Sequence, residues 1–328
     1  MAFWPEFDKI NGVKVACFPD ITPAYFPVGY ANLNATKQVD DVRNVAKTIK
    51  YFIVYSEYQR TQVLSSNLGV DIENIKTVSI SSFVNNTLED VNTEKNFKSF
   101  FSDPVKRFSR ERLKLLPDYS LPEIKNYLVG LLSDYSFENT KYIFYASQAR
   151  PQKNIINLVK AYEYLLRRKE VTFKLFLTCY PNHNPELKEY IFSHRLQFDV
   201  LCFNGVSNQL LAALYASAEL VVNPTLYEGG FPLTFSEGMS VGIPSVMGKI
   251  PQVMDVISNF ELSDYMFDPF DYFDIADKIM LGLSNKELLY DMEKPLFEML
   301  LREKNNIGKE YVDAFKYFIN KEKSQIHK

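Results

Sequence analysis

The second half of the chain alternates short apolar runs with helical patterns, and this alternation limits the fold more than any other feature. Residues 142–145 form an apolar run of strand length, and residues 154–167 then place apolar side chains at helical spacing. Further strand-like runs lie at 173–177, 200–203, 220–222 and 245–247, with helical patterns at 209–217 and 233–241. Such alternation is typical of a parallel sheet covered by helices on both faces. The sequence therefore predicts an α/β fold.

The first 85 residues carry fewer elements of the same kind. Strand patterns lie at 13–18, 51–55 and 77–81, and helical patterns at 37–50 and 57–67. These are too few strands for a complete doubly wound domain, so we expect an incomplete first domain. Residues 86–140 are polar and irregular apart from a helical pattern at 122–132, and the chain is helical and charged after 285. The expected divisions are a partial Rossmann-like domain at 1–118, a connection at 119–140, a whole Rossmann-like domain at 141–305 and a helix at 306–328 that crosses back.

Composition excludes several classes of protein. The net charge is −3 and the pI about 5.8, which argues against a nucleic-acid partner. Cys17, Cys179 and Cys202 are odd in number and widely spaced, which argues against a disulfide framework or a zinc site. Cys179 and Cys202 lie in apolar, strand-like runs, which predict buried free thiols. The first residues lack a signal-peptide pattern, and no apolar run approaches the ~20 residues of a spanning helix. We expect a cytoplasmic protein, with a peripheral contact at the inner face of the membrane left open.

Residues 223–246 combine a glycine turn with two carboxylates. After the strand that ends at 222, Gly229 and Gly230 allow a tight turn and a close backbone approach to a ligand. The start of the next helix attracts phosphate through its unpaired N–H groups and the helix dipole. Glu228 precedes the glycines and Glu237 lies in the helix. The stretch therefore predicts a site for a phosphate and for sugar or ribose hydroxyls.

Residues 147–154 again join a strand to a helix and carry two cations. Arg150 and Lys153 lie at that junction, where they could clamp a diphosphate together with the glycine loop. Charge-assisted hydrogen bonds of this kind contribute roughly 1.5–3 kcal/mol each. Taken singly, each feature has a structural explanation, because glycine turns end many α/β strands and lone surface charges are usually solvated. Only their combination in one half of the chain favours a ligand site.

The spans YASQARPQKNIINLVKAYEYL, CFNGVSNQLLAALYASAELVVNPTLYEGGFPLTFSEGMSVGIPSVMG and FDPFD resemble glycosyltransferase family 4, a retaining family with the GT-B fold. The resemblance covers about residues 142–283 in the family's order. It implies two Rossmann-like domains facing a cleft. It also implies that Arg150 and Lys153 bind the donor's phosphates, that Glu228 contacts the transferred sugar as the catalytic-site glutamate, and that Glu237 holds the nucleotide ribose. Further contacts to the donor are implied for Gly229, Gly230, Phe231, Pro232, Leu233, Gly205 and Val206.

The resemblance further implies transfer of a hexose-type sugar from a nucleoside diphosphate sugar to a glycan or lipid-linked hydroxyl. No Asp-any-Asp motif ends a strand, so we expect no metal and no cofactor, with cations and helix N–H groups neutralising the leaving diphosphate. Eight residues separate Glu228 from Glu237 where the family usually has seven, and we place the extra one in the glycine loop. The segment CFPDITPAYFP matches more loosely, with Pro19 at the usual histidine and Asp20 retained. An Asp before a turn is more often a turn former.

Two other functions stay open at this point. The first domain resembles the family only from its middle onward, so the chain could be a non-catalytic donor-binding fragment, or one completed by a partner chain that supplies the missing segment. The other alternative is a nucleotide-sugar epimerase of the same two-domain fold. An epimerase needs acid and base groups on both faces of the sugar, and the sequence offers no such pair.

Overall fold

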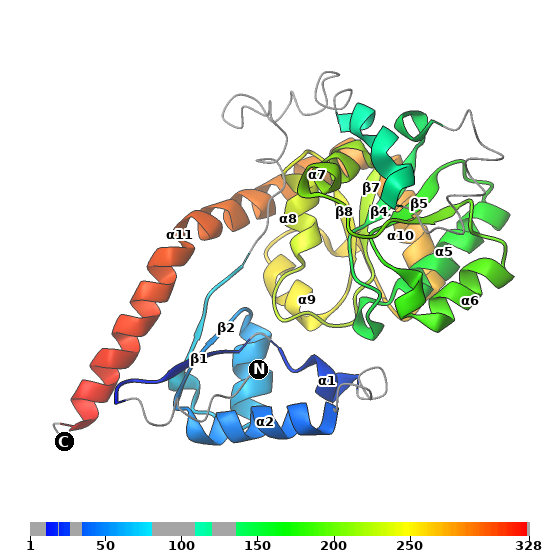
Figure 1. The fold of residues 1–328 in the computed structure, drawn as a ribbon. Helices are drawn as coiled ribbons and strands as arrows, with labels where there is room; N and C mark the ends of the chain where they lie inside the picture. Colours follow the sequence, from blue (N-terminus) through cyan, green and yellow to red (C-terminus); the bar gives the residue numbers. More distant parts are fainter. Residues whose placement is uncertain (1–10, 19, 27–34, 81–108, 120–135, 327–328) are drawn as a thin grey trace.

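Two parallel β-sheets organise the chain (Figure 1). The structure is a computed structural model that describes residues 11–18, 20–26, 35–80, 109–119 and 136–326. Within these residues, the first sheet has the order β1-β2-β3 and the second the order β6-β5-β4-β7-β8-β9. The α/β architecture predicted from the alternation of apolar runs is confirmed.

The central strand of the first sheet is buried on both faces because its side chains alternate between two cores. This sheet consists of β1 (Val15–Phe18), β2 (Tyr51–Val54) and β3 (Ile75–Thr77). Phe52 and Val54 pack with α2 (Ala35–Thr48) and with the π-helical η3 (Gln59–Asn67), whereas Tyr51 and Ile53 face the end of the chain. All four β2 residues are therefore buried, as is usual for a strand covered on both sides.

Two details of this region differ from the sequence expectations. The third strand begins at Ile75 rather than at residue 77, because Asp71 caps the short helix η4 (Ile72–Asn74) and the chain becomes extended directly after it. The helical pattern at 57–67 forms a π-helix, not an α-helix. The helix expected at 122–132 and the departure at Pro19 lie outside the described residues.

The second sheet also separates two cores. Its strands are β4 (Tyr142–Tyr145), β5 (Lys174–Leu177), β6 (Val200–Cys202), β7 (Leu220–Asn223), β8 (Ser245–Gly248) and β9 (Met266–Phe267). Ile143 and Tyr145 face α5 (Ile155–Arg168), α6 (Pro185–Ser193) and α10 (Tyr272–Ser284), while Tyr142 and Phe144 face α7 (Asn208–Ser217). The remaining helices include α1 (Thr22–Tyr25), α8 (Leu233–Met239) and α9 (Pro251–Ile257).

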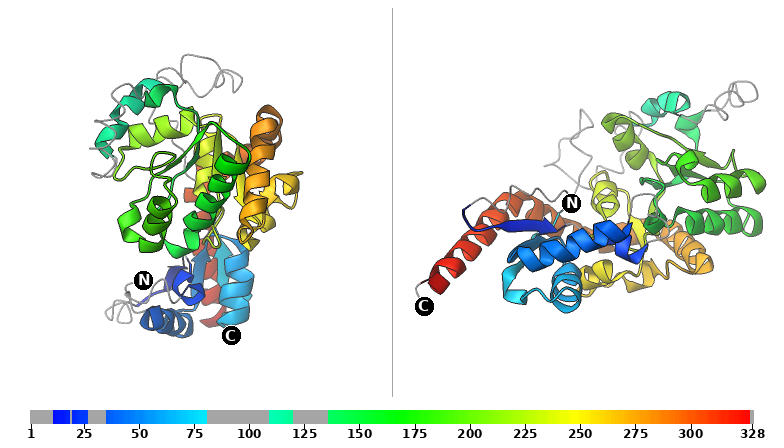
Figure 2. Two further views of the ribbon diagram at one scale, coloured as in Figure 1. Left: turned by 90° about the vertical axis from the view of Figure 1, so that its right-hand side faces the viewer. Right: turned by 60° about the horizontal axis from the view of Figure 1, so that its bottom comes forward.

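A single long helix joins the second sheet to the first. Helix α11 (Lys286–Ile326) leaves the second unit, contains Pro295, and lies along the first unit (Figures 1 and 2). Phe318 stacks on Tyr51 with ring centroids 4.8 Å apart, and Lys50 pairs with Glu322 at 2.6 Å. The last helix therefore completes the core of the first unit with residues from the end of the chain.

Candidate functional site

The strand order of the second, all-parallel sheet reverses at β4, and this reversal places the candidate site. From β4 the chain adds β5 and β6 on one side, and then returns to place β7, β8 and β9 on the other. The loops after β4 and β7 therefore diverge and leave a crevice at the carboxyl ends of the strands. Arg150 and Lys153 follow β4, and Glu228 follows β7. Residues that are 75 positions apart are thus brought to one crevice.

Lys153 and Glu228 meet in this crevice. The Lys153 Nζ lies 2.5 Å from the Glu228 Oε1, and the two side chains keep about a fifth of their surface exposed. Asn154 fixes the loop below them, since its Nδ2 donates to the backbone oxygens of Pro224 and Pro269 at 3.0 and 2.6 Å. The pair is therefore held on a rigid base and still reaches solvent.

Arg150 lines a hollow of about 340 Å³ whose lining includes neither Lys153 nor Glu228. The hollow opens at the ends of β4, β5 and β6, and its lining residues are Gln148, Ala149, Arg150, Thr178, Cys179, Tyr180, His183 and Asn204. Asn204 begins the segment 204–207 that the resemblance places near a nucleotide base, while Gly205 and Val206 follow it outside the lining. The sequence favours a surface role for His183 and does not point to this hollow. The signal that could have pointed to this hollow is that its lining residues directly follow strands of a parallel sheet.

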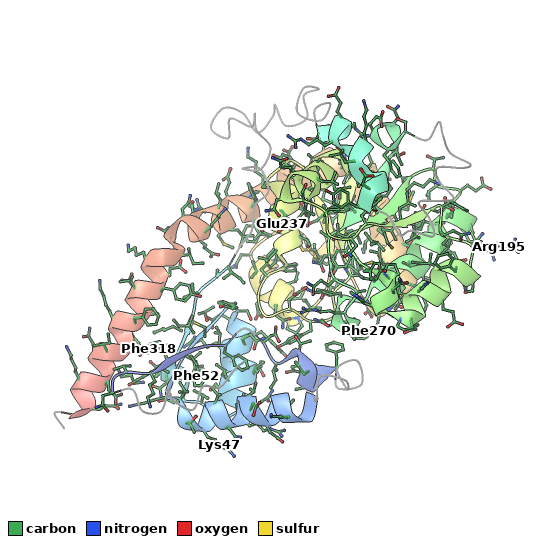
Figure 3. The ribbon with its side chains drawn as sticks, in the orientation of Figure 1. Lys47, Phe52, Arg195, Glu237, Phe270 and Phe318 are labelled. Atoms are coloured by element: carbon green, nitrogen blue, oxygen red, sulfur yellow. The ribbon has the colours of Figure 1, made fainter. Side chains whose placement is uncertain are left out.

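Glu237 lies in helix α8 (Figure 3), whereas Glu228 lies on the loop that precedes this helix. The Tyr215 hydroxyl donates to the Glu237 Oε2 at 2.5 Å, which fixes the carboxylate from helix α7. Burial, followed by the negative charge of Glu237, raises the pKa of Tyr215 well above its usual range. Tyr215 therefore stays a hydrogen-bond donor at neutral pH, and the Glu237 carboxylate keeps one fixed orientation.

The glycine loop packs against the first unit and is hydrogen-bonded to it. The Ser56 hydroxyl donates to the Gly229 carbonyl at 3.0 Å, and the Gln59 side-chain amide donates to the Tyr227 hydroxyl at 2.5 Å. Gly230 lies so close to the first unit that a Cβ at this position would stand 2.9 Å from the Tyr55 carbonyl oxygen. The loop therefore belongs to the interface between the two units, with Phe231, Pro232 and Leu233 leading from it into α8.

Asp20 acts as a turn former, the alternative that the sequence favours. Its Oδ1 accepts a hydrogen bond from the Thr22 backbone at 2.9 Å. Within the described part of the chain, no three His, Cys, Asp or Glu side chains are grouped to hold a metal ion. Among the same residues, no helix is both long and apolar enough to cross a membrane. The thiols of Cys179 and Cys202 are free and buried, as predicted, whereas the free thiol of Cys17 is exposed.

The part of the chain that holds Lys153 and Glu228 matches known sequences. Residues 134–295, slightly less than half of the chain, match the family described as Glycosyl transferases group 1. The O-antigen chain mannosyltransferase B of Escherichia coli is 27% identical over 186 residues, 56% of this chain and 48% of that protein. The MMP alpha-(1->4)-mannosyltransferase of Mycolicibacterium hassiacum is 35% identical over 112 residues, 33% of this chain and 26% of that protein. The chain thus spans about half the length, or less, of these relatives.

Solved structures show the fold over more of the chain. Anabaena HepE, solved in complex with UDP and glucose, matches with a TM-score of 0.63 at 14% identity, over 92% of this chain and 71% of that chain. Sucrose-phosphate synthase from Thermosynechococcus elongatus matches with a TM-score of 0.65 at 15% identity, over 95% and 70%. The fold is of the GT-B type, with two Rossmann-like units that face each other, and this expectation is confirmed.

Proposed function

We propose that the chain transfers a hexose-type sugar from a nucleoside diphosphate sugar to a hydroxyl of a glycan or lipid-linked acceptor, with retention of configuration. The observation that carries the proposal is the Lys153–Glu228 pair in the crevice where the strand order of the second sheet reverses. The glycosyltransferase match over residues 134–295 covers both residues. The names of two relatives favour mannose as the sugar.

The ion pair suits a site that must hold a sugar beside a diphosphate. An unpaired carboxylate would repel the incoming phosphates, and Lys153 removes this repulsion by pairing with Glu228. In the proposed complex, Lys153 and Arg150 neutralise the diphosphate as it leaves, together with backbone N–H groups at the start of α8. Glu228 then orients the sugar hydroxyls.

The nucleoside fits the hollow at the ends of β4, β5 and β6. Its volume of about 340 Å³ and its position beside Arg150 suit a base and ribose whose phosphates extend toward Lys153. Glu237, held by Tyr215, would accept hydrogen bonds from the ribose. The leaving phosphate itself would take the proton of the acceptor hydroxyl, so the reaction would require neither a separate base nor a metal.

Calorimetry with nucleoside diphosphates and their hexose derivatives tests the donor site. Lys153→Ala and Glu228→Ala should each weaken donor binding by roughly tenfold or more, since each removes a charge-assisted hydrogen bond worth roughly 1.5–3 kcal/mol. Lys160→Ala is the matched control, because Lys160 lies on α5 outside the crevice. Equal affinities for Lys153→Ala and Lys160→Ala would refute the assignment.

A transfer assay separates an enzyme from a donor-binding protein. Donor consumption that depends on an added acceptor, with an α-linked product from an α-linked donor, supports transfer with retention. Donor binding without turnover, with acceptors of several classes, would instead favour the non-catalytic alternative. Interconversion of the donor's sugar without any acceptor would favour an epimerase.

A further inference from the structure

A second hollow, of about 110 Å³, lies between the two units and shares no lining residue with the first. One wall is the carboxyl end of the first sheet, with Tyr55 and Glu57. A second wall is α9, and a third is α11 with Glu303. Phe231 of the glycine loop lines it as well, so the hollow adjoins the proposed site of transfer.

Gln252 of α9 is the most unusual side chain of this hollow. It is fully buried, yet neither its amide nitrogen nor its amide oxygen has a hydrogen-bond partner among the described residues. A buried amide without partners costs free energy, whereas a bound molecule that both donates and accepts hydrogen bonds would satisfy it. The Gln252 amide, which lies in the wall of a hollow, is therefore a candidate group for hydrogen bonds to a bound molecule.

The charges around Gln252 restrict what can bind. Glu57, Asp255 and Glu303 line the hollow, and its described lining contains no Lys or Arg. Burial raises the pKa of Asp255, and the negative charge of Glu57 adds to the rise. Burial likewise raises the pKa of Glu303. Arg60 pairs with Glu57 at 3.1 Å but does not line the hollow, so the charged side chains that line it are all carboxyl groups, which would repel a bound anion.

We propose that this hollow binds one uncharged or amine-bearing sugar unit of the acceptor, recognised by the Gln252 amide and rejecting acidic sugars. Sugar hydroxyls both donate and accept, which meets both needs of a side-chain amide. A water needs roughly 10–15 Å³, so the hollow has room for several waters or for part of one sugar ring. Tyr55 and Phe231 add aromatic walls. Its role as an acceptor site rests on the proposed function.

Saturation-transfer NMR and calorimetry on the whole chain test the proposal with three probes of similar size. These are methyl mannoside, glucosamine and glucuronate. We expect millimolar binding of the first two, and binding of glucuronate at least tenfold weaker. Gln252→Leu should weaken methyl mannoside by about tenfold, while Gln209→Leu, the same change on an exposed helix start, should leave it unchanged. Glu303→Gln should reduce the difference in affinity between methyl mannoside and glucuronate.

A stability measurement separates recognition from a structural role. Gln252→Leu removes an unpaired amide, so the unliganded variant should melt at the same temperature as the parent protein or higher. A lower melting temperature, unchanged methyl mannoside binding in Gln252→Leu, or equal binding of glucuronate would overturn the proposal. Binding of a panel of nucleoside diphosphates is measured on the same samples. If none of them binds, the donor site is refuted, whereas nucleotide binding without any sugar binding refutes only this inference.

Discussion

Gly230→Ala should separate the two units without unfolding either of them. The added Cβ would lie 2.9 Å from the Tyr55 carbonyl oxygen and 3.2 Å from the Tyr55 Cβ. The closer of these is a backbone atom, so no rotation of a side chain can relieve the clash. The glycine loop and β2 must therefore move apart.

The free-energy cost of Gly230→Ala is worked from one overpacked contact and one lost hydrogen bond. Overpacking by one methyl group costs about 1–3 kcal/mol when the surroundings must shift. Separation also breaks the hydrogen bond from Ser56 to Gly229, which contributes about 0.5–1.5 kcal/mol. Together these shift the equilibrium toward the open arrangement by about 1.5–4.5 kcal/mol, and each 1.4 kcal/mol is about a factor of ten in the equilibrium constant.

Three measurements check this reasoning. Small-angle scattering should show a larger radius of gyration for Gly230→Ala, and kcat/KM for transfer should fall by at least about tenfold. Urea unfolding of the second unit should be unchanged. Gly308→Ala is the control, because a Cβ at this position of α11 meets nothing within 4 Å and should stabilise the helix by up to about 1 kcal/mol. An unchanged radius and unchanged activity in Gly230→Ala would refute the reasoning.

Three further substitutions test side-chain hydrogen bonds in the second unit. Asn154→Ala should destabilise the protein by about 2–4 kcal/mol in urea unfolding, since it removes two hydrogen bonds and leaves a left-handed residue without its side-chain support; a loss below about 1 kcal/mol would contradict this. Glu293 is fully buried and its pKa is raised well above 4.5, first by burial, so the unfolded chain releases its proton at lower pH than the folded chain. Stability should therefore fall as the pH rises above about 4.5, by at most about 1.4 kcal/mol per unit, and Glu293→Gln should remove this slope in urea unfolding at pH 5–7.5. Tyr215→Phe releases the Glu237 carboxylate and should weaken donor binding several-fold by calorimetry; unchanged affinity would argue against a ribose contact.

The sheets were predictable because their strands are buried on both faces. Runs such as 142–145 carry no alternation of apolar and polar residues, and a run of this kind by itself indicates a strand of a covered parallel sheet. The order of the strands was not predicted, since the reversal at β4 depends on contacts between distant segments.

Within the site, residues on short loops were predictable and contacts between units were not. Arg150, Lys153, Glu228 and Glu237 could be chosen from local patterns, although their roles remain predictions. The bond from Gln59 to Tyr227 joins residues 168 positions apart and leaves no local pattern. Asn154 was expected to begin a helix, yet it adopts a left-handed conformation and supports the loops with its side chain instead.

Helix α11 has a consequence for how the protein is made. Tyr51 and Ile53 of β2 are covered by Ala314 and Phe318, which a ribosome adds more than 250 residues later. One face of the first sheet is therefore exposed throughout most of synthesis, and exposed apolar strands of this kind are prone to aggregate. The first unit is translated before the second yet completes its core after it, and we expect a nascent chain that lacks α11 to bind chaperones through this face.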